Sequence, residues 1–261
     1  MRIDIVTLFP EMFASFLDGS LLGAARRAGI LDVRLRNFRD FAPGAHRQVD
    51  DRPFGGGPGM LLMPGPVVEC VEAVQQDGER PGHVVMLTPG GRRLDQGLVE
   101  ELARRERLVL VCGRYEGFDH RAFGLRYGVA TGLLSVGDFV LSGGELSALI
   151  VTDAVVRLLP GALGNDQSAI DESHADDGLL EHRHYTRPVV FEGQRIPPVL
   201  LSGDHQRIDQ ARAKDGLLLT RALRPDLFVR RRRVKGREKL LGDERVASLD
   251  PEREPPRDAG S

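Results

Sequence analysis

Three glycine-rich segments between residues 55 and 145 could bring polypeptide backbone close to a bound molecule. Glycine has no Cβ, so it reaches positive φ and lets backbone N–H and C=O groups approach a ligand. The segments are residues 55–60, 113–117 and 135–145. The last two accompany apolar runs with strand character, and ligands of open α/β sheets bind outside the carboxyl ends of strands. These loops therefore predict a ligand site.

None of the three segments has the signature of a common nucleotide-binding loop. No Gly-Lys-Ser/Thr follows them, and none has Gly-x-Gly-x-x-Gly spacing followed by a suitable acid. An ATP or NAD site thus loses its usual support. A different adenosine-containing ligand stays open.

Acidic and basic side chains are concentrated in different parts of the second half. Residues 161–177 hold five acidic and no Lys or Arg side chains, whereas residues 178–247 hold 16 basic against 9 acidic ones, within a chain of formal net charge −2. A basic region of this kind binds polyanions. A solvated helix face has the same composition, so both interpretations stay open.

The elements that must position these groups follow from apolar periodicity. Apolar runs predict strands at residues 3–9, 31–38, 83–87, 108–112 and 136–141. Helical spacing predicts helices after Pro10 and at residues 67–74, 94–107, 144–159 and 204–219. Strands that alternate with helices predict an α/β fold with a mainly parallel sheet covered on both faces.

Composition predicts two domains and a linker in a soluble protein. We expect a domain at residues 1–160, a flexible acidic linker at 161–177, a basic and mostly helical domain at 178–247, and a disordered tail at 248–261. No apolar stretch approaches the roughly 18–20 residues that span a bilayer. The chain has only two cysteines, Cys70 and Cys112, which favours a reduced, cytoplasmic setting.

Five longer motifs occur along the chain in a fixed order. They are DDRPFGGGPGM at residues 50–60, VCGRYEG at 111–117, SVGDFVLSGGE at 135–145, HYTRP at 184–188 and PPVLLSG at 197–203. In this order they resemble the bacterial tRNA (guanine-N(1)-)-methyltransferase family, TrmD. The resemblance runs from Met1 to about Leu227.

The resemblance implies a SPOUT-type α/β fold with a deep trefoil knot, plus a smaller, mostly helical C-terminal domain. It also implies that S-adenosylmethionine binds in the knot loops. The residues that match the cofactor loops are Leu87, Thr88, Pro89, Gly90, Gly113, Tyr115, Glu116, Gly117, Val136, Gly137, Asp138, Phe139, Val140, Leu141, Gly143 and Gly144. For Val136, Phe139 and Leu141, a purely core position is the alternative.

The implied reaction is methylation of N1 of the guanosine at tRNA position 37, next to the anticodon. That nitrogen carries a proton, so a carboxylate must remove it, and a cation near O6 helps. The match assigns the cation to Arg157 and places Glu172 where the family has an Asp. Asp171 is the adjacent candidate for the base, and the remaining alternative is that both are solvated linker acids.

The resemblance further implies tRNA as partner and an antiparallel homodimer whose active site is shared between subunits, with no membrane association. The residues that match substrate-binding segments are Arg52, Pro58, Gly59, Ser168, His184, Tyr185 and Arg187. Residues 230–233, four consecutive arginines, either contact the tRNA backbone or form a solvated helix end. Mg²⁺ is a further expectation, although the sequence has no dedicated ligand cluster.

Two rival functions stay in view. A related SPOUT enzyme could methylate a ribose 2′-hydroxyl, which requires no linker carboxylate. Alternatively, the chain could be a non-catalytic RNA-binding protein that keeps the fold.

Overall fold

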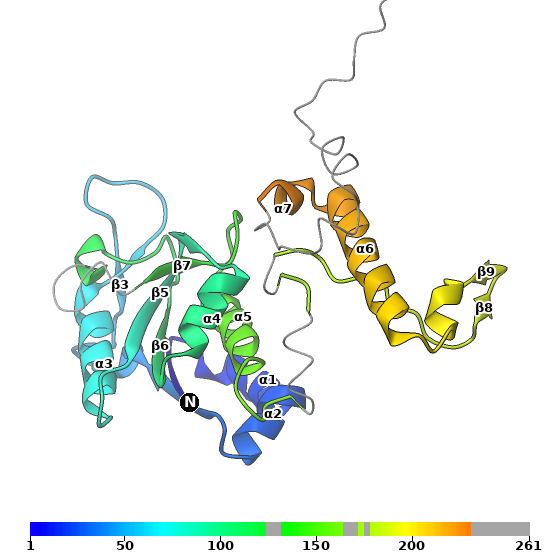
Figure 1. The fold of residues 1–261 in the computed structure, drawn as a ribbon. Helices are drawn as coiled ribbons and strands as arrows, with labels where there is room; N and C mark the ends of the chain where they lie inside the picture. Colours follow the sequence, from blue (N-terminus) through cyan, green and yellow to red (C-terminus); the bar gives the residue numbers. More distant parts are fainter. Residues whose placement is uncertain (124–131, 164–171, 175–177, 231–261) are drawn as a thin grey trace, which may run out of the picture. The chain divides into compact units, whose positions relative to one another are not determined.

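The computed structural model describes residues 1–123, 132–163, 172–174 and 178–230. The chain divides into two compact units, Met1–Asp166 and Gln167–Ser261, which are described separately (Figure 1). Several sequence-based predictions fall outside the described residues: Ser168, Asp171, most of the acidic segment, three of the four consecutive arginines and the tail at residues 248–261.

A five-stranded parallel sheet forms the centre of the first unit (Figure 1). Its strands are β1 (Arg2–Thr7), β2 (Asp32–Asn37), β5 (His83–Arg93), β6 (Arg107–Cys112) and β7 (Leu133–Ser135), in the order β2-β1-β6-β5-β7. All neighbouring pairs are parallel, which confirms the predicted sheet type. Every residue of the central strand β6 is buried, as its unbroken apolar run predicts for a strand covered on both faces.

Helices cover both faces of this sheet. One core joins Ile3, Ile5 and Leu110 to the apolar sides of α1 (Ala14–Asp18), α2 (Ser20–Arg27), α4 (Gln96–Ala103) and α5 (Glu145–Val156). The other core joins Val6 and Val111 to α3 (Pro64–Gln76). The alternation of strand residues between the two cores follows from the two-residue period of a strand.

Three predicted helices are shorter or divided in the structure, and one of them, predicted at residues 144–159, covers Glu145–Val156. The apolar segment after Pro10 is divided into the 3₁₀ turn η1 (Pro10–Phe13), α1 and α2, because Gly19 adopts an extended conformation between the two α-helices. The helix predicted at residues 94–107 ends at Ala103, and Arg107 already begins β6.

The strand predicted at residues 136–141 is wrong. β7 ends at Ser135, whose hydroxyl donates to the Gly137 carbonyl at 2.9 Å and accepts from the Gly137 N–H at 3.2 Å. These bonds turn the chain away from the sheet. The apolar residues that follow, Phe139 and Val140, are 56% and 82% exposed, so their character does not reflect burial in a sheet.

Strand β5 leaves the sheet for four residues and then returns. Leu87 and Arg92 both pair with Leu134 of β7, so residues 88–91 form a bulge between them. A Cβ at Gly91 would collide with the backbone of Leu133 and Leu134, so this close approach requires glycine. The bulge carries Thr88, Pro89 and Gly90 beyond the end of the sheet.

Smaller elements complete the first unit. They are the 3₁₀ turns η2 (Phe38–Phe41) and η3 (His120–Phe123) and the antiparallel pair β3 (Asp50–Asp51) and β4 (Leu61–Leu62).

The second unit is built around the helix α6 (His205–Leu223). The Asp204 side chain accepts from the Arg207 N–H at 3.1 Å and begins this helix, which contains the predicted helix 204–219 apart from its capping residue. Its other elements are the hairpin β8 (Val190–Phe191) and β9 (Gln194–Arg195), the turn η5 (Pro198–Leu201) and α7 (Pro225–Arg230). A small core joins Leu179, Leu217 and Phe228.

In the described residues, every helix is either too short or too polar to cross a membrane.

A buried ion pair fixes the amino-terminal end of the sheet. Arg107 Nε donates to Asp4 Oδ2 at 2.8 Å, with the Asp4 side chain fully buried and that of Arg107 7% exposed. The other guanidinium nitrogens donate to the carbonyls of Arg80 and Val74. Loss of the carboxylate would leave a buried cation without its counter-charge.

We expect Asp4→Ala to lower the free energy of unfolding by about 3–5 kcal/mol, the usual cost of removing one partner of a buried pair. Glu106→Ala is the matched control, because the Arg80–Glu106 pair is 77% and 76% exposed. Its loss should cost about 0–1 kcal/mol. Urea unfolding measures both, and equal effects would contradict the assignment.

Candidate active site

A cavity of about 300 Å³ opens at the carboxyl ends of β5, β6 and β7. Its walls come from the bulge after Leu87, the loop that follows β6, the loop that follows β7, and the first turns of α5. The parallel sheet explains this convergence, since all three strands end at the same edge.

Most of the residues predicted to bind the cofactor line this cavity. They are Leu87, Thr88, Pro89, Gly113, Tyr115, Glu116, Gly117, Val136, Phe139, Val140, Leu141, Gly143 and Gly144. Gly90, Gly137 and Asp138 are not among the lining residues. Asp138 is 86% exposed and pairs with Arg93 at 3.5 Å.

The sequence interpretation missed six lining residues. They are Arg114, Phe118, Leu134, Ser135, Ser142 and Ser147. Three of them, Arg114, Ser135 and Ser142, lie inside the glycine-rich motifs, so their position could have been found there.

The Arg114 side chain contacts Phe9 after β1, Ser142 in the loop before α5, and Glu145 in the first turn of α5. Its Nη1 donates to the Ser142 carbonyl at 3.2 Å, and its guanidinium carbon lies 4.4 Å from the centre of the Phe9 ring. Its Nε lies 2.9 Å from Glu145 Oε2, a charge contact whose geometry is not that of a hydrogen bond. Arg114 thus connects the loop after β6 to the loop before α5.

The partner of Arg114 is a buried carboxylate. Glu145 is 1% exposed, and Thr7 Oγ1 at the end of β1 donates to its Oε1 at 2.8 Å. The thiol of Cys112, the last residue of β6, is buried and lies close enough to Glu145 to be affected by its charge. Burial, assisted by the negative charge of Glu145, raises the pKa of Cys112 well above its ordinary value, so this thiol stays protonated and unreactive in the fold.

The loop before α5 packs directly on the backbone after β6. The Gly144 N–H donates to the Gly113 carbonyl at 2.8 Å. A Cβ at Gly144 would lie 2.8 Å from both the Cys112 Cα and the Gly113 nitrogen. Only glycine permits this contact.

The first glycine-rich segment joins the same site. Glu116 N–H donates to the Met60 carbonyl at 2.9 Å, and Leu62 N–H donates to the Gly117 carbonyl at 2.9 Å. A Cβ at Gly59 would collide with the carboxyl group of Glu116, so Gly59 lies against a cavity residue. The predicted substrate residues Pro58 and Gly59 are therefore close to the cavity wall, while Arg52 is exposed.

Arg157 lies at the opposite end of α5 from the cavity. It is the C-terminal cap of the helix, whereas Gly144 at the amino-terminal cap lines the cavity. At 1.5 Å per residue, the 13 positions between them correspond to roughly 20 Å. Within one chain, the structure does not bring Arg157 into the cavity.

The remaining predicted site residues belong to the second unit. Glu172 is in a short turn in which Ser173 Oγ accepts from the Glu181 N–H at 3.0 Å. His184, Tyr185 and Arg187 are exposed.

Arg183 and Asp215 fasten this segment to α6. The Arg183 N–H donates to Asp215 Oδ2 at 2.8 Å, and its Nη2 donates to Oδ1 at 2.6 Å. Burial opposes ionisation of the carboxyl group, but these bonds and the Arg183 charge outweigh it and lower the pKa of Asp215.

Fold and cavity together define an α/β protein with a cavity among loops that follow adjacent parallel strands. The chain belongs to the tRNA (Guanine-1)-methyltransferase TrmD family, whose model matches residues 1–230. This confirms the family resemblance.

Curated relatives agree with the family assignment. A Dehalococcoides mccartyi protein named tRNA (guanine-N(1)-)-methyltransferase is 49% identical over 96% of this chain and 99% of its own length. Proteins of the same name from Brevibacillus brevis and Bacillus cereus are 48% and 46% identical over 93% and 92% of this chain, and 98% and 97% of their own lengths.

We expect Gly144→Ala to destabilise the first unit by about 1–3 kcal/mol, because the added methyl group meets backbone that cannot rotate away. Gly65→Ala is the control, since a Cβ there meets nothing within 4 Å. Thermal and urea unfolding measure the difference. An unchanged midpoint for Gly144→Ala would contradict the tight contact.

Proposed function

We propose that this chain methylates N1 of the guanosine at tRNA position 37, next to the anticodon, with S-adenosylmethionine as methyl donor. The observation that carries the proposal is the cavity formed by the three loops that match the family's cofactor motifs. The family's curated members, named for guanine-N(1) methylation, give the reaction class.

The residues present fit S-adenosylmethionine. Gly113, Gly143 and Gly144 expose backbone at the cavity, while Val136 and Leu141 supply apolar walls. A few polar contacts within a mostly apolar pocket are typical of cofactor sites. When bound, S-adenosylmethionine supplies an electrophilic methyl group.

The chain's own residues must then make the guanine nitrogen nucleophilic. In this proposal Glu172 removes the N1 proton, with Asp171 as the alternative base. Arg157 stabilises the negative charge that develops on O6. General base catalysis contributes about 10²–10⁴-fold in rate, and one oriented donor contributes about 3–4 kcal/mol.

The proposal includes a homodimer in which each active site takes residues from both chains. The roughly 20 Å between the cavity and Arg157 supports it, because one chain alone cannot supply both. Exposed apolar side chains also favour an interface with a second chain. Leu146 and Ile150, one helical turn apart on α5, are 49% and 45% exposed, and Phe16 of α1 is 45% exposed.

The trefoil knot of the family belongs to the same proposal. The chain leaves β7, which pairs with β5, and continues into α5, which packs against β1 and β6. Between β7 and α5 the chain runs alongside the loop after β6, where the Gly144 N–H donates a hydrogen bond to the Gly113 carbonyl. Such a path is what a knotted C-terminal half requires.

The second unit, with its exposed His184, Tyr185 and Arg187, would hold tRNA in this scheme. Contacts of basic side chains to phosphate position the RNA without reading its sequence. The target base must also leave its stack to reach the cofactor. A tRNA-modifying enzyme of this kind acts in the cytoplasm.

Mg²⁺ stays part of this proposal with no step assigned to it, and its candidate ligands are the linker acids, most of which lie outside the described residues. Within the described residues, one group of His, Cys, Asp and Glu side chains is close enough to hold a metal ion, and two of its members are imidazoles. Mg²⁺ prefers oxygen ligands, so that group does not fit it.

We expect Glu172→Gln to reduce the methylation rate by about 10²–10⁴-fold while S-adenosylmethionine still binds, because the amide cannot take the N1 proton. Asp171→Asn is the matched control and should change the rate less than tenfold. Single-turnover methyl transfer to a tRNA transcript measures the rate, and calorimetry measures cofactor binding. The reverse pattern would assign the base to Asp171.

The transcripts themselves separate the rival functions. Replacement of guanosine 37 by adenosine should abolish transfer. Methylation of a ribose 2′-hydroxyl would indicate the related SPOUT chemistry instead, and no methylation of any transcript would indicate a binding protein. Full activity in a variant that combines Glu172→Gln with Asp171→Asn would contradict catalysis by a linker carboxylate.

Leu146→Asp should convert the dimer to monomers, because it places a charge in the apolar face of α5 that we propose is covered. Leu223→Asp on α6, at a leucine 64% exposed in the second unit, is the control and should leave the dimer intact. Sedimentation velocity measures both. A monomeric unmodified chain would contradict the shared site.

A further inference from the structure

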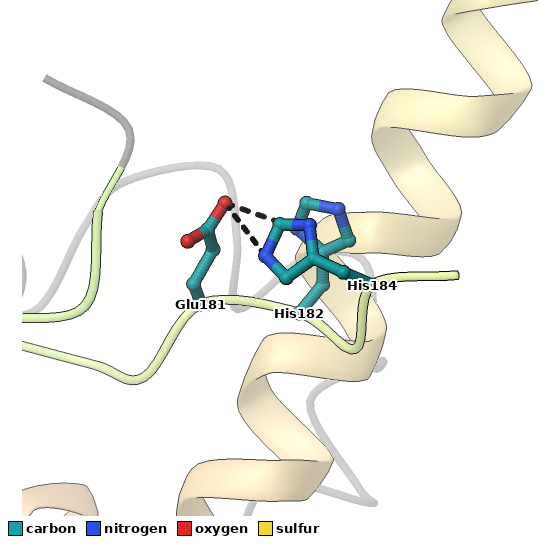
Figure 2. A group of neighbouring side chains, drawn as sticks. All are labelled: Glu181, His182 and His184. Carbon is teal, nitrogen blue, oxygen red and sulfur yellow. Dashed lines mark ion pairs between the residues drawn. The ribbon is translucent and has the colours of Figure 1, made fainter. Parts of the chain in front are cut away.

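Three potential metal ligands converge in the second unit, where Glu181, His182 and His184 point toward one another beside α6 (Figure 2). Glu181 Oε1 lies 3.1 Å from His184 Nε2 and 3.9 Å from His182 Nδ1. One ligand atom from each side chain lies within 4.8 Å of the others. The two imidazole rings are 4.5 Å apart at their centres.

These separations are close to those around a bound zinc ion. In a tetrahedral site with ligand bonds of about 2.0–2.1 Å, neighbouring ligand atoms lie about 3.3–3.4 Å apart. The two distances from Glu181 Oε1 fall on either side of this value, and no two of the three ligand atoms lie more than 4.8 Å apart, so side-chain rotations would have to bring all three donors to this separation. We propose that Glu181, His182 and His184 bind Zn²⁺, with the fourth position open to water.

The backbone around the cluster is anchored on both sides. Before it, the Leu180 N–H donates to Thr220 Oγ1 of α6 at 2.8 Å. Within it, the Arg183 N–H and guanidinium bond Asp215 of α6. Neighbouring side chains of an extended strand point to opposite faces, but here Glu181 and His182 converge (Figure 2). The fold thus holds this irregular segment in a shape that gathers the ligands.

The type of donors selects the ion. Imidazole nitrogens with one carboxylate are a common ligand set for zinc, whereas Mg²⁺ and Ca²⁺ prefer oxygen. Three protein ligands with an open fourth position differ from the closed sites that use four side chains. His184 would then be a metal ligand in the zinc-loaded chain, rather than a free imidazole available to RNA.

The test is Zn²⁺ binding to the full chain after removal of metal by a chelator and dialysis. Competition against a chromophoric chelator should show one equivalent of Zn²⁺ per chain. His182→Gln and Glu181→Gln should each weaken binding at least tenfold, since each removes one of three ligands. The matched control is His205→Gln, an exposed histidine of the same unit outside the cluster, which should bind as the unmodified chain does.

Co²⁺ gives a second readout that needs no variant. Bound at two nitrogens, one carboxylate and water, it should give the visible absorption of a tetrahedral ion, and Zn²⁺ should remove it. Far-UV circular dichroism shows whether each variant keeps its helices.

Two results would overturn the proposal. One is the absence of stoichiometric binding to the unmodified chain at micromolar Zn²⁺. The other is unchanged affinity in a folded Glu181→Gln/His182→Gln double variant; either would leave the cluster as an ordinary Glu–His ion pair. Because neither assay uses tRNA or S-adenosylmethionine, its outcome is independent of methyl transfer.

Discussion

The close contact of Gly144 with the backbone after β6 is the constraint on which the candidate active site depends. The hydrogen bond from Gly144 to Gly113 holds the loop before α5 on the end of β6. Arg114 adds a charge contact to Glu145, which Thr7 in turn orients from β1. Backbone contacts and a buried charge together fix the cavity walls.

The second organising feature is the length of α5. Its amino-terminal end contributes to the cavity, and its carboxyl end presents Arg157. The helix separates two functions that the proposed reaction needs side by side. The exposed Leu146 and Ile150 lie between these ends, on the surface through which a second chain would supply the missing group.

The sequence predicted the sheet and the segments that form the cavity, but it predicted residues 136–141 as a strand, whereas β7 ends at Ser135 and these residues form a loop. Strand β6 was predictable because a strand buried on both faces reads as an unbroken apolar run. Residues 136–141 are also mainly apolar, although Gly137 and Asp138 interrupt the run, yet Val136 and Leu141 line a cavity and the Ser135 hydroxyl turns the chain. The periodicity of apolar residues cannot distinguish a side chain in the hydrophobic core from one that lines a cavity.

The Glu181, His182 and His184 cluster was missed because its convergence depends on anchoring to α6, which sequence spacing does not encode.

The detour in β5 has a consequence for how this protein tolerates change. Leu87 and Arg92 share the partner Leu134, so the ladder resumes after the bulge as though residues 88–91 were absent. Changes at residues 88–90 would alter the rim of the pocket, whereas Gly91 must stay glycine because a Cβ there would collide with the backbone of Leu133 and Leu134. The fold thereby separates the part that sets ligand preference from the part that sets stability, and evolution can adjust the first without rebuilding the second.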